Sequence, residues 1–252
     1  MFWRVVALAL IVGSFRSFAT SIVAVRTLED VSIAADSLGM FTRQDGSSYS
    51  RSVCKIHRIG DVFVGIAGFD ADPINGFSVL QIVSDAIRGK RNFVERMAAA
   101  GSAIESALPS EARSLRERRP ADFREITDPK AGGVAIILVG MEDGTPSVMV
   151  QKFGISVTPA AEIRIVPSEI LSCPGSDCPG GHYIFRLGQS DAISKYLSKG
   201  PYVVADSAEF ARSLVQLEVD DPTVSTTVGG PIDVVRISKS DEQWVQQKPV
   251  CR

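Results

Sequence analysis

The chain has 252 residues, of which 45% are hydrophobic and 22% are charged, and its formal net charge is −2 at pH 7. This composition is typical of a globular protein that is long enough for one large domain or two small ones. The isoelectric point near 5.8 argues against a nucleic-acid partner, because a basic binding face normally raises it.

Residues 1–19 have the three parts of a signal peptide. Arg4 supplies a positive charge, residues 5–13 are apolar, and Ser17-Phe18-Ala19 offers small residues at the positions that a signal peptidase reads. The apolar run is too short to cross a bilayer, which takes about 20 residues. The alternatives are an uncleaved anchor and a buried strand. We predict cleavage after Ala19, which gives a periplasmic or secreted protein that starts at Thr20 and has no stable membrane insertion.

The first half of the remaining chain predicts short strands followed by helices. The strands are expected at residues 20–25, 31–35, 51–56 and 61–67, with a turn-rich loop at residues 44–48. Apolar residues at helical spacing predict helices at residues 73–88 and 92–108. We interpret the arginine-rich stretch from Arg113 to Arg119 as a solvated helix end rather than an anion site.

The second half repeats this order. Strands are expected at residues 133–140, 147–153, 163–171 and 183–187, with a hairpin turn at Asp143-Gly144. Helices at residues 190–197 and 208–217 and a strand at residues 231–238 follow, and the chain ends in a polar tail from Gln243. Because strands and helices do not alternate, a doubly wound parallel sheet is excluded. The order predicts an α+β domain over residues 20–252, with two antiparallel sheets covered by helix pairs.

The four cysteines fit an exported protein. Cys173 and Cys178 bracket a turn-forming segment that a disulfide can close, and Cys54 and Cys251 remain as a second pair, although the sequence does not fix the connectivity. The rival interpretation is a metal site formed by Cys173, Cys178 and His182, but it lacks a fourth ligand. We therefore expect disulfides and no metal.

A threonine at the N-terminus carries its own base. Its free α-amine has a pKa of about 7.7–8.0, so it can take the hydroxyl proton as Oγ attacks a carbonyl. Before cleavage this nitrogen is an amide, so processing of the leader would switch on the activity. Asp36 and Lys55 lie at the ends of strands that flank Thr20. A cation there would lower the pKa values of the threonine, although such a pair is usually an ordinary ion pair.

Five motifs follow one another along the chain. They are Thr20-Ser21-Ile22-Val23-Ala24-Val25, Ala34-Ala35-Asp36-Ser37, Lys55-Ile56-His57-Arg58-Ile59, Ala67-Gly68-Phe69-Asp70-Ala71-Asp72 and Gly229-Gly230-Pro231-Ile232-Asp233-Val234. In order and spacing they resemble the N-terminal nucleophile (Ntn) hydrolases, and among these the proteasome-type β subunits, which are threonine peptidases. The resemblance covers most of the chain after Thr20. It implies a four-layer αββα sandwich, which agrees with the predicted order of elements.

The resemblance also implies roles for single residues. Thr20 would be the nucleophile, Asp36 would orient Lys55, and Lys55 would tune the electrostatics of Thr20. The backbone N–H of Gly68 would face the oxyanion, although Gly68 is also interpretable as a turn glycine. Val53 and Ile66 fall where the family lines its first specificity pocket, and both are equally compatible with a core position.

Two segments depart from the family pattern. The family's Gly-Ser-Gly segment is represented by residues 187–191, where either Gln189 replaces the serine or Ser190 shifts into its place. The family's Asp-x-x-Ser segment is represented by residues 225–228, which contain no acid, and Asp220 or Asp221 would substitute only across a longer loop. These groups normally surround the threonine amine.

We therefore predict an exported hydrolase that cleaves peptide or other amide bonds through an acyl-enzyme on Thr20, without a cofactor. The alternative is a catalytically inactive, proteasome-like scaffold or assembly subunit. In a third scheme Ser21 becomes the terminal nucleophile. Family members usually form rings, so the resemblance raises a homo-oligomer as a partner state and leaves the number of subunits open.

Overall fold

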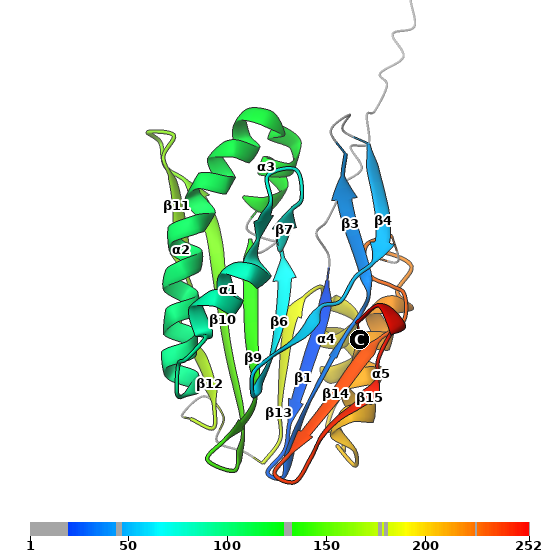
Figure 1. The fold of residues 1–252 in the computed structure, drawn as a ribbon. Helices are drawn as coiled ribbons and strands as arrows, with labels where there is room; N and C mark the ends of the chain where they lie inside the picture. The colour runs from blue at the N-terminus through cyan, green and yellow to red at the C-terminus, as the bar shows by residue number, and fades with distance from the viewer. Residues whose placement is uncertain are drawn as a thin grey trace, which may run out of the picture.

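The computed structural model describes residues 20–43, 47–128, 133–175, 178, 181–224 and 226–251, with only the backbone of Thr42 and Val250. The predicted leader, residues 1–19, lies outside the described residues. Two antiparallel sheets form the centre of the molecule (Figure 1). The first sheet has the order β13 (Tyr183–Gly188), β1 (Ser21–Arg26), β2 (Asp30–Ala35), β14 (Asp233–Ser238) and β15 (Glu242–Gln246).

The second sheet contains the strands on either side of the long hairpin in the middle of the chain. Its order is β11 (Ile163–Pro167), β10 (Thr145–Val157), β9 (Val134–Glu142), β6 (Val62–Gly68) and β5 (Ile56–Ile59), and β12 (Leu171–Cys173) also pairs with β10. The predicted turn joins β9 to β10, with positive φ at Asp143 and Gly144. All these ladders are antiparallel, which confirms the α+β class with antiparallel sheets.

The described residues form five α-helices. Three of them, α1 (Val79–Ile87), α2 (Phe93–Arg118) and α3 (Pro120–Ile126), lie beside the second sheet, and α4 (Asp191–Leu197) and α5 (Ser207–Val219) lie beside the first (Figure 1). Side chains cap three of these helices: Ser78 accepts a hydrogen bond from the first turn of α1, Asn92 from that of α2, and Asp206 from that of α5. Such caps satisfy N–H groups that have no partner within the helix.

Apolar residues alternate between the two faces of β1. Ile22 and Ala24 pack in a cluster that also contains Phe63 and Ile137 of the second sheet, whereas Val23 packs in a cluster with α5. A third cluster joins the other face of the second sheet to α1, α2 and α3. Residues 22–25 of β1 form a continuous apolar run, as expected for a strand that is buried on both faces.

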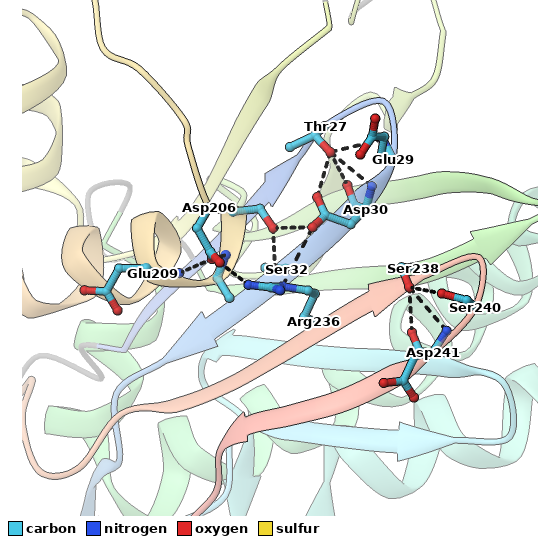
Figure 2. A network of polar contacts seen from close by, with 12 residues as sticks. Thr27, Glu29, Asp30, Ser32, Asp206, Glu209, Arg236, Ser238, Ser240 and Asp241 are labelled. Carbon is cyan, nitrogen blue, oxygen red and sulfur yellow. Dashed lines mark hydrogen bonds and ion pairs between the residues drawn. The ribbon is translucent and has the colours of Figure 1, made fainter.

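Two polar networks connect the loops and the C-terminal segment to the first sheet. At the turn between β1 and β2, Asp30 accepts a hydrogen bond from Ser207 (2.9 Å), and Arg236 of β14 pairs with Asp206 (Figure 2). This network attaches the start of α5 to the end of the sheet opposite Thr20. The second network, around Lys248, is described below.

The disulfides join Cys173 to Cys178 and Cys54 to Cys251, which confirms the expected pairs. Both sulfurs of the first pair are thereby consumed, so the alternative metal site is wrong. Among the described residues no cluster of metal-binding side chains is found. Disulfides of this kind indicate an oxidising compartment. No helix in the described part of the chain is both long and apolar enough to span a membrane.

Several element predictions were wrong. The first predicted helix begins at Val79 rather than residue 73, after the small hairpin of β7 (Ala71–Asp72) and β8 (Phe77–Ser78). Helix α2 continues through Pro109 to Arg118, because Leu108, Ala112 and Leu115 keep one buried face. A proline normally ends a helix by removing a donor, and here the packing of that face outweighs the loss. The polar tail contains β15 and a short 3₁₀ helix (Pro249–Cys251).

The arginine-rich stretch is also not simply solvated. It forms the last turns of α2, and Arg119, which follows that helix, pairs with two acids of low exposure, Asp72 and Asp122. These pairs hold the end of α2 against the β7–β8 hairpin. They leave Arg119 engaged within the protein.

Candidate active site

Thr20 lies directly before β1, an inner strand of the first sheet, and only 7% of its surface is exposed. Its carbonyl accepts a hydrogen bond from the backbone N–H of Gln189 (2.7 Å). The neighbouring Gly188 has a φ of +72°, and a Cβ there would lie 1.8 Å from the Thr20 carbonyl oxygen. Only glycine permits this close approach, which fixes the threonine backbone between β1 and β13.

Asp36 follows β2 and is completely buried. One carboxylate oxygen accepts the Ser21 N–H (2.9 Å) and the Lys55 ammonium (2.6 Å), and the other accepts the N–H groups of Leu38 and Gly229 (both 3.1 Å). Four donors thus satisfy the hydrogen-bonding capacity of this buried carboxylate. The predicted Asp36–Lys55 pair is therefore present, and it touches the residue that follows Thr20.

Lys55 is 5% exposed and lies in the break between two strands. The sequence predicts one strand over residues 51–56, but β4 (Ser48–Ser52) ends before Lys55 and β5 begins after it. Burial lowers the pKa of Lys55, and the carboxylate of Asp36 opposes this by raising it. An ammonium with a lowered pKa is poised to exchange its proton nearer to neutral pH than an exposed lysine.

Thr20 and Lys55 line the same pocket. Gly68 and Asp70 also line it, with about 300 Å³ of space that opens to solvent. Its apolar wall comes from the segment after Asp36 and from the residue before Cys54: Leu38, Gly39, Met40, Phe41 and Val53. The pocket is therefore a small cleft whose surface is about equally polar and apolar, and its lining includes one residue with a hydroxyl, one with an ammonium and one with a carboxylate.

The hairpin of β3 (Leu38–Thr42) and β4 supplies much of this wall and extends beyond the start of β1 (Figure 1). Aromatic and cationic side chains stack along it. The Phe41 and Tyr49 rings lie 5.5 Å apart, and the Arg51 guanidinium lies 4.3 Å from the Phe41 ring centroid. Such stacking stabilises a two-stranded hairpin that has few other contacts.

Gly68 ends β6 with a φ of +87°, and a Cβ there would lie 2.1 Å from the Gly133 carbonyl oxygen. The next residue, Phe69, donates its N–H to that carbonyl (2.8 Å). On the other side of β6, β5 reaches only to Ile56, which pairs with Gly65, so no residue of β5 lies opposite Gly68.

The other predicted residues are placed differently. Val53 lines the pocket, whereas Ile66 is buried in the cluster with α1 and α2 and is not among the pocket-lining residues. The Gln189 side chain donates to Asp191, and neither it nor Ser190 lines the pocket. Asp220 accepts from Gln216 and Asp221 from Thr223, both away from the pocket.

Asp70 is the pocket residue that the sequence did not single out. It stands two residues after Gly68, and its charge raises the pKa of Lys55. Desolvation by the surrounding protein raises the pKa of Asp70, and the charge of Lys55 lowers it. Asp70 nevertheless keeps contact with solvent. The signal was present in the motif that contains Gly68, but an acid after a strand has many structural explanations. Met40 and Phe41 were missed because their strand was not predicted.

In three dimensions the chain is similar to Anbu from Hyphomicrobium sp. strain MC1. The TM-score is 0.51 at 16% sequence identity, and the match covers 90% of this chain and 87% of that chain. The Anbu (Gly-1) mutant from the same organism matches with a TM-score of 0.52 and 15% identity over the same shares. No protein-family model and no curated protein matches the sequence. The similarity shows that this chain has the Anbu fold.

Proposed function

We propose that this protein is an exported N-terminal-threonine hydrolase that cleaves peptide or other amide bonds. The observation that carries the proposal is the shared pocket of Thr20, Lys55 and Gly68, with Asp36 buried behind Lys55. A proteasome-like fold alone is compatible with many functions. The proposal therefore rests on the arrangement of three side chains, those of Thr20, Asp36 and Lys55, and of the Gly68 backbone. It also includes the αββα layering, which the three separate apolar clusters support.

The chemistry begins when cleavage after Ala19 liberates the α-amine of Thr20. As Oγ attacks the substrate carbonyl, its proton moves to that amine, and the Lys55 ammonium stabilises the developing charge. The Gly68 N–H donates to the oxyanion, a contact worth about 3–4 kcal/mol in comparable sites. Collapse breaks the C–N bond, the leaving amine takes the proton, and an ester on Thr20 remains.

Water then completes the reaction. It attacks the ester carbonyl while the amine again takes a proton, and the C–O bond breaks to return that proton to Oγ. No step needs a cofactor. The apolar wall of Leu38, Met40, Phe41 and Val53 favours an apolar substrate side chain beside the scissile bond.

Export fits the same proposal. The disulfides need an oxidising compartment, and a periplasmic or secreted location supplies one. Cleavage by a signal peptidase would then both release the protein and create the catalytic amine. The proposal also includes a homo-oligomer, because the family that the sequence resembles usually forms rings.

A second candidate is a catalytically silent scaffold. It is favoured by the positions of Gln189, Ser190, Asp220 and Asp221, none of which lines the pocket. In this scheme the Asp36–Lys55 pair only stabilises the fold.

One experiment separates the two. The exported protein is incubated with a β-lactone, and its intact mass is measured before and after. The hydrolase predicts a protein that starts at Thr20 and gains one acyl group, with no gain in Thr20→Ala and a retained gain in Thr20→Ser. A protein that starts at Thr20 and gains no mass contradicts the hydrolase and leaves the scaffold.

A further inference from the structure

The segment that carries Lys55 belongs to neither sheet. Residues 53–55 lie between β4 and β5, and one hydrogen bond in register with the β3–β4 ladder reaches them, from the Val53 N–H to the Ser37 carbonyl (2.8 Å). A catalytic lysine has to be held accurately, since an error of about 1 Å can cost 100-fold in rate. The contacts that replace the missing ladder therefore bear directly on the proposed chemistry.

Two of these contacts come from the far end of the chain. The Lys248 ammonium donates to the carbonyl of Val53, and Cys251 forms a disulfide with Cys54. Val53 and Cys54 are the two residues directly before Lys55. The attachment therefore reaches the catalytic segment from a region 197 residues away in the sequence.

The end of the chain is itself anchored to the first sheet. Asp233 of β14 accepts the backbone N–H of Lys248 (2.8 Å) and pairs with its ammonium (2.9 Å), and both side chains are nearly completely buried. Within the segment, Cys251 donates its N–H to the Lys248 carbonyl (3.0 Å), and Gln247 donates to the carbonyl of Cys251 (2.8 Å).

The anchor lies next to the acid that holds Lys55. Asp233 pairs across the sheet with Ala35, the residue before Asp36. The contacts thus close a ring that runs from Asp36 through β14 and Lys248 to the segment before Lys55, and back through the Lys55–Asp36 pair. A ring of this kind fixes the backbone before Lys55 relative to Asp36.

We propose that residues 247–251 form a C-terminal clamp that positions Lys55 for catalysis, with Lys248 and the Cys54–Cys251 disulfide as its two attachments. None of the clamp residues lines the pocket, so they act on the reaction through the segment before Lys55 and, for Lys248, also through its charge near the Lys55 ammonium. This proposal rests on the proposed hydrolase function.

The chain offers a matched control for the disulfide. The variant Cys54→Ser/Cys251→Ser removes the clamp disulfide, and Cys173→Ser/Cys178→Ser removes the other one, which closes a short loop beside β12. Both lose a cross-link and are expected to melt at lower temperature. The clamp predicts that only the first variant is labelled by the β-lactone at least tenfold more slowly. Equal labelling rates in the two variants would overturn it.

A second pair of variants leaves both disulfides in place. Lys248→Met removes the charge and the donor to Val53, and Lys248→Arg keeps a cation with several donors. We expect labelling to slow about tenfold in Lys248→Met and to recover at least partly in Lys248→Arg. A general loss of stability would not distinguish the two in this way. If Lys248→Met is labelled as fast as the wild type, the clamp is wrong.

Hydrogen exchange in peptides that cover residues 51–59 gives a readout independent of activity. Faster exchange is expected in Cys54→Ser/Cys251→Ser and in Lys248→Met, and unchanged exchange in Cys173→Ser/Cys178→Ser. Unchanged exchange in the clamp variants overturns the clamp even if labelling falls. A wild-type protein that takes up no lactone contradicts the proposed hydrolase, and the exchange result still decides whether the clamp holds the segment.

Discussion

Two buried lysine–aspartate pairs lie close together in this molecule and differ in what their ammonium groups face. Lys55 pairs with Asp36 at 2.6 Å and Lys248 pairs with Asp233 at 2.9 Å, and all four side chains are at most 4% exposed. Lys55 lines the pocket with Thr20, whereas the Lys248 ammonium also donates a hydrogen bond to the carbonyl of Val53. The comparison suggests that pairing alone does not distinguish a catalytic lysine from a positioning one.

The acids differ in the same way. Asp36 accepts three backbone N–H groups as well as its lysine, and Asp233 accepts the backbone N–H of its own lysine partner. Buried ion pairs contribute little net stability, because desolvation offsets much of the attraction. Their retention at these two places is better explained by geometry, one pair at the site and the other behind it.

The largest effect should separate the two lysines. Lys55→Met is expected to slow β-lactone labelling at least 100-fold, which is within the range of acid–base contributions, whereas Lys248→Met should cost about tenfold. Circular dichroism and thermal melting check that both variants fold. Equal losses in the two folded variants would break the comparison, because the roles of the two lysines would then be the same.

Substitution of each aspartate by asparagine tests how much each ion pair contributes to the stability of the fold. Asp36→Asn and Asp233→Asn should each lower the free energy of unfolding by about 3–5 kcal/mol, because a buried ammonium is left uncompensated. Asp36→Asn should be the more costly, since its amide nitrogen cannot accept the backbone N–H groups. Urea unfolding of both variants measures this. A cost below 1 kcal/mol at Asp36 would show that its lysine finds another partner.

Gly68→Ala sharpens the pocket side of the comparison. The new Cβ would meet the Gly133 carbonyl oxygen, and the positive φ adds strain, so we expect a loss of about 1–3 kcal/mol and little labelling. Gly60→Ala is the control, because Gly60 also has a positive φ of +65° but has no atom within 4 Å of the new Cβ. If Gly68→Ala loses no more stability than Gly60→Ala and is labelled normally, the close approach of Gly68 to Gly133 does not position the pocket.

The smallest effect is on pH dependence. Burial lowers the pKa of Lys55 below its ordinary 10.5, so the labelling rate should fall at alkaline pH before an exposed lysine would titrate. Asp36 and Asp70 raise this pKa, and Lys248 lowers it. Lys248→Met should therefore move the alkaline limb to higher pH, while Lys248→Arg should leave it in place. A movement to lower pH would contradict the stated electrostatics.

Stability gives the matching sign. The unfolded chain binds a proton on Lys55 up to its ordinary pKa, whereas the folded protein releases it earlier. Between the lowered pKa and 10.5 the unfolded state therefore holds more protons, and the contribution of Lys55 to stability rises with pH. Unfolding curves of wild type and Lys55→Met should diverge in this window, with the wild type gaining relative to the variant.

The sequence predicted the Asp36–Lys55 pair, but it did not predict the contacts that hold the segment before Lys55. Asp36 and Lys55 could be predicted to pair because family-like motifs mark both. The break at residues 53–55 could not, since the residues on either side favour strands. The burial of Lys248 in a polar tail depends on Asp233 and Cys54, which are distant in the chain. Periodicity reports local structure and does not register such long-range contacts. For the same reason the sequence did not predict β3, and it placed the strand that follows the loop at residues 51–56 rather than at β4.

The most direct test of the account locates the reacting atom. The exported protein is labelled with the β-lactone and digested, and its N-terminal peptide is fragmented in a mass spectrometer. The account predicts a peptide that begins with Thr20 and carries the acyl group on that residue. An N-terminus at another position, or an acyl group on any other residue, would contradict it.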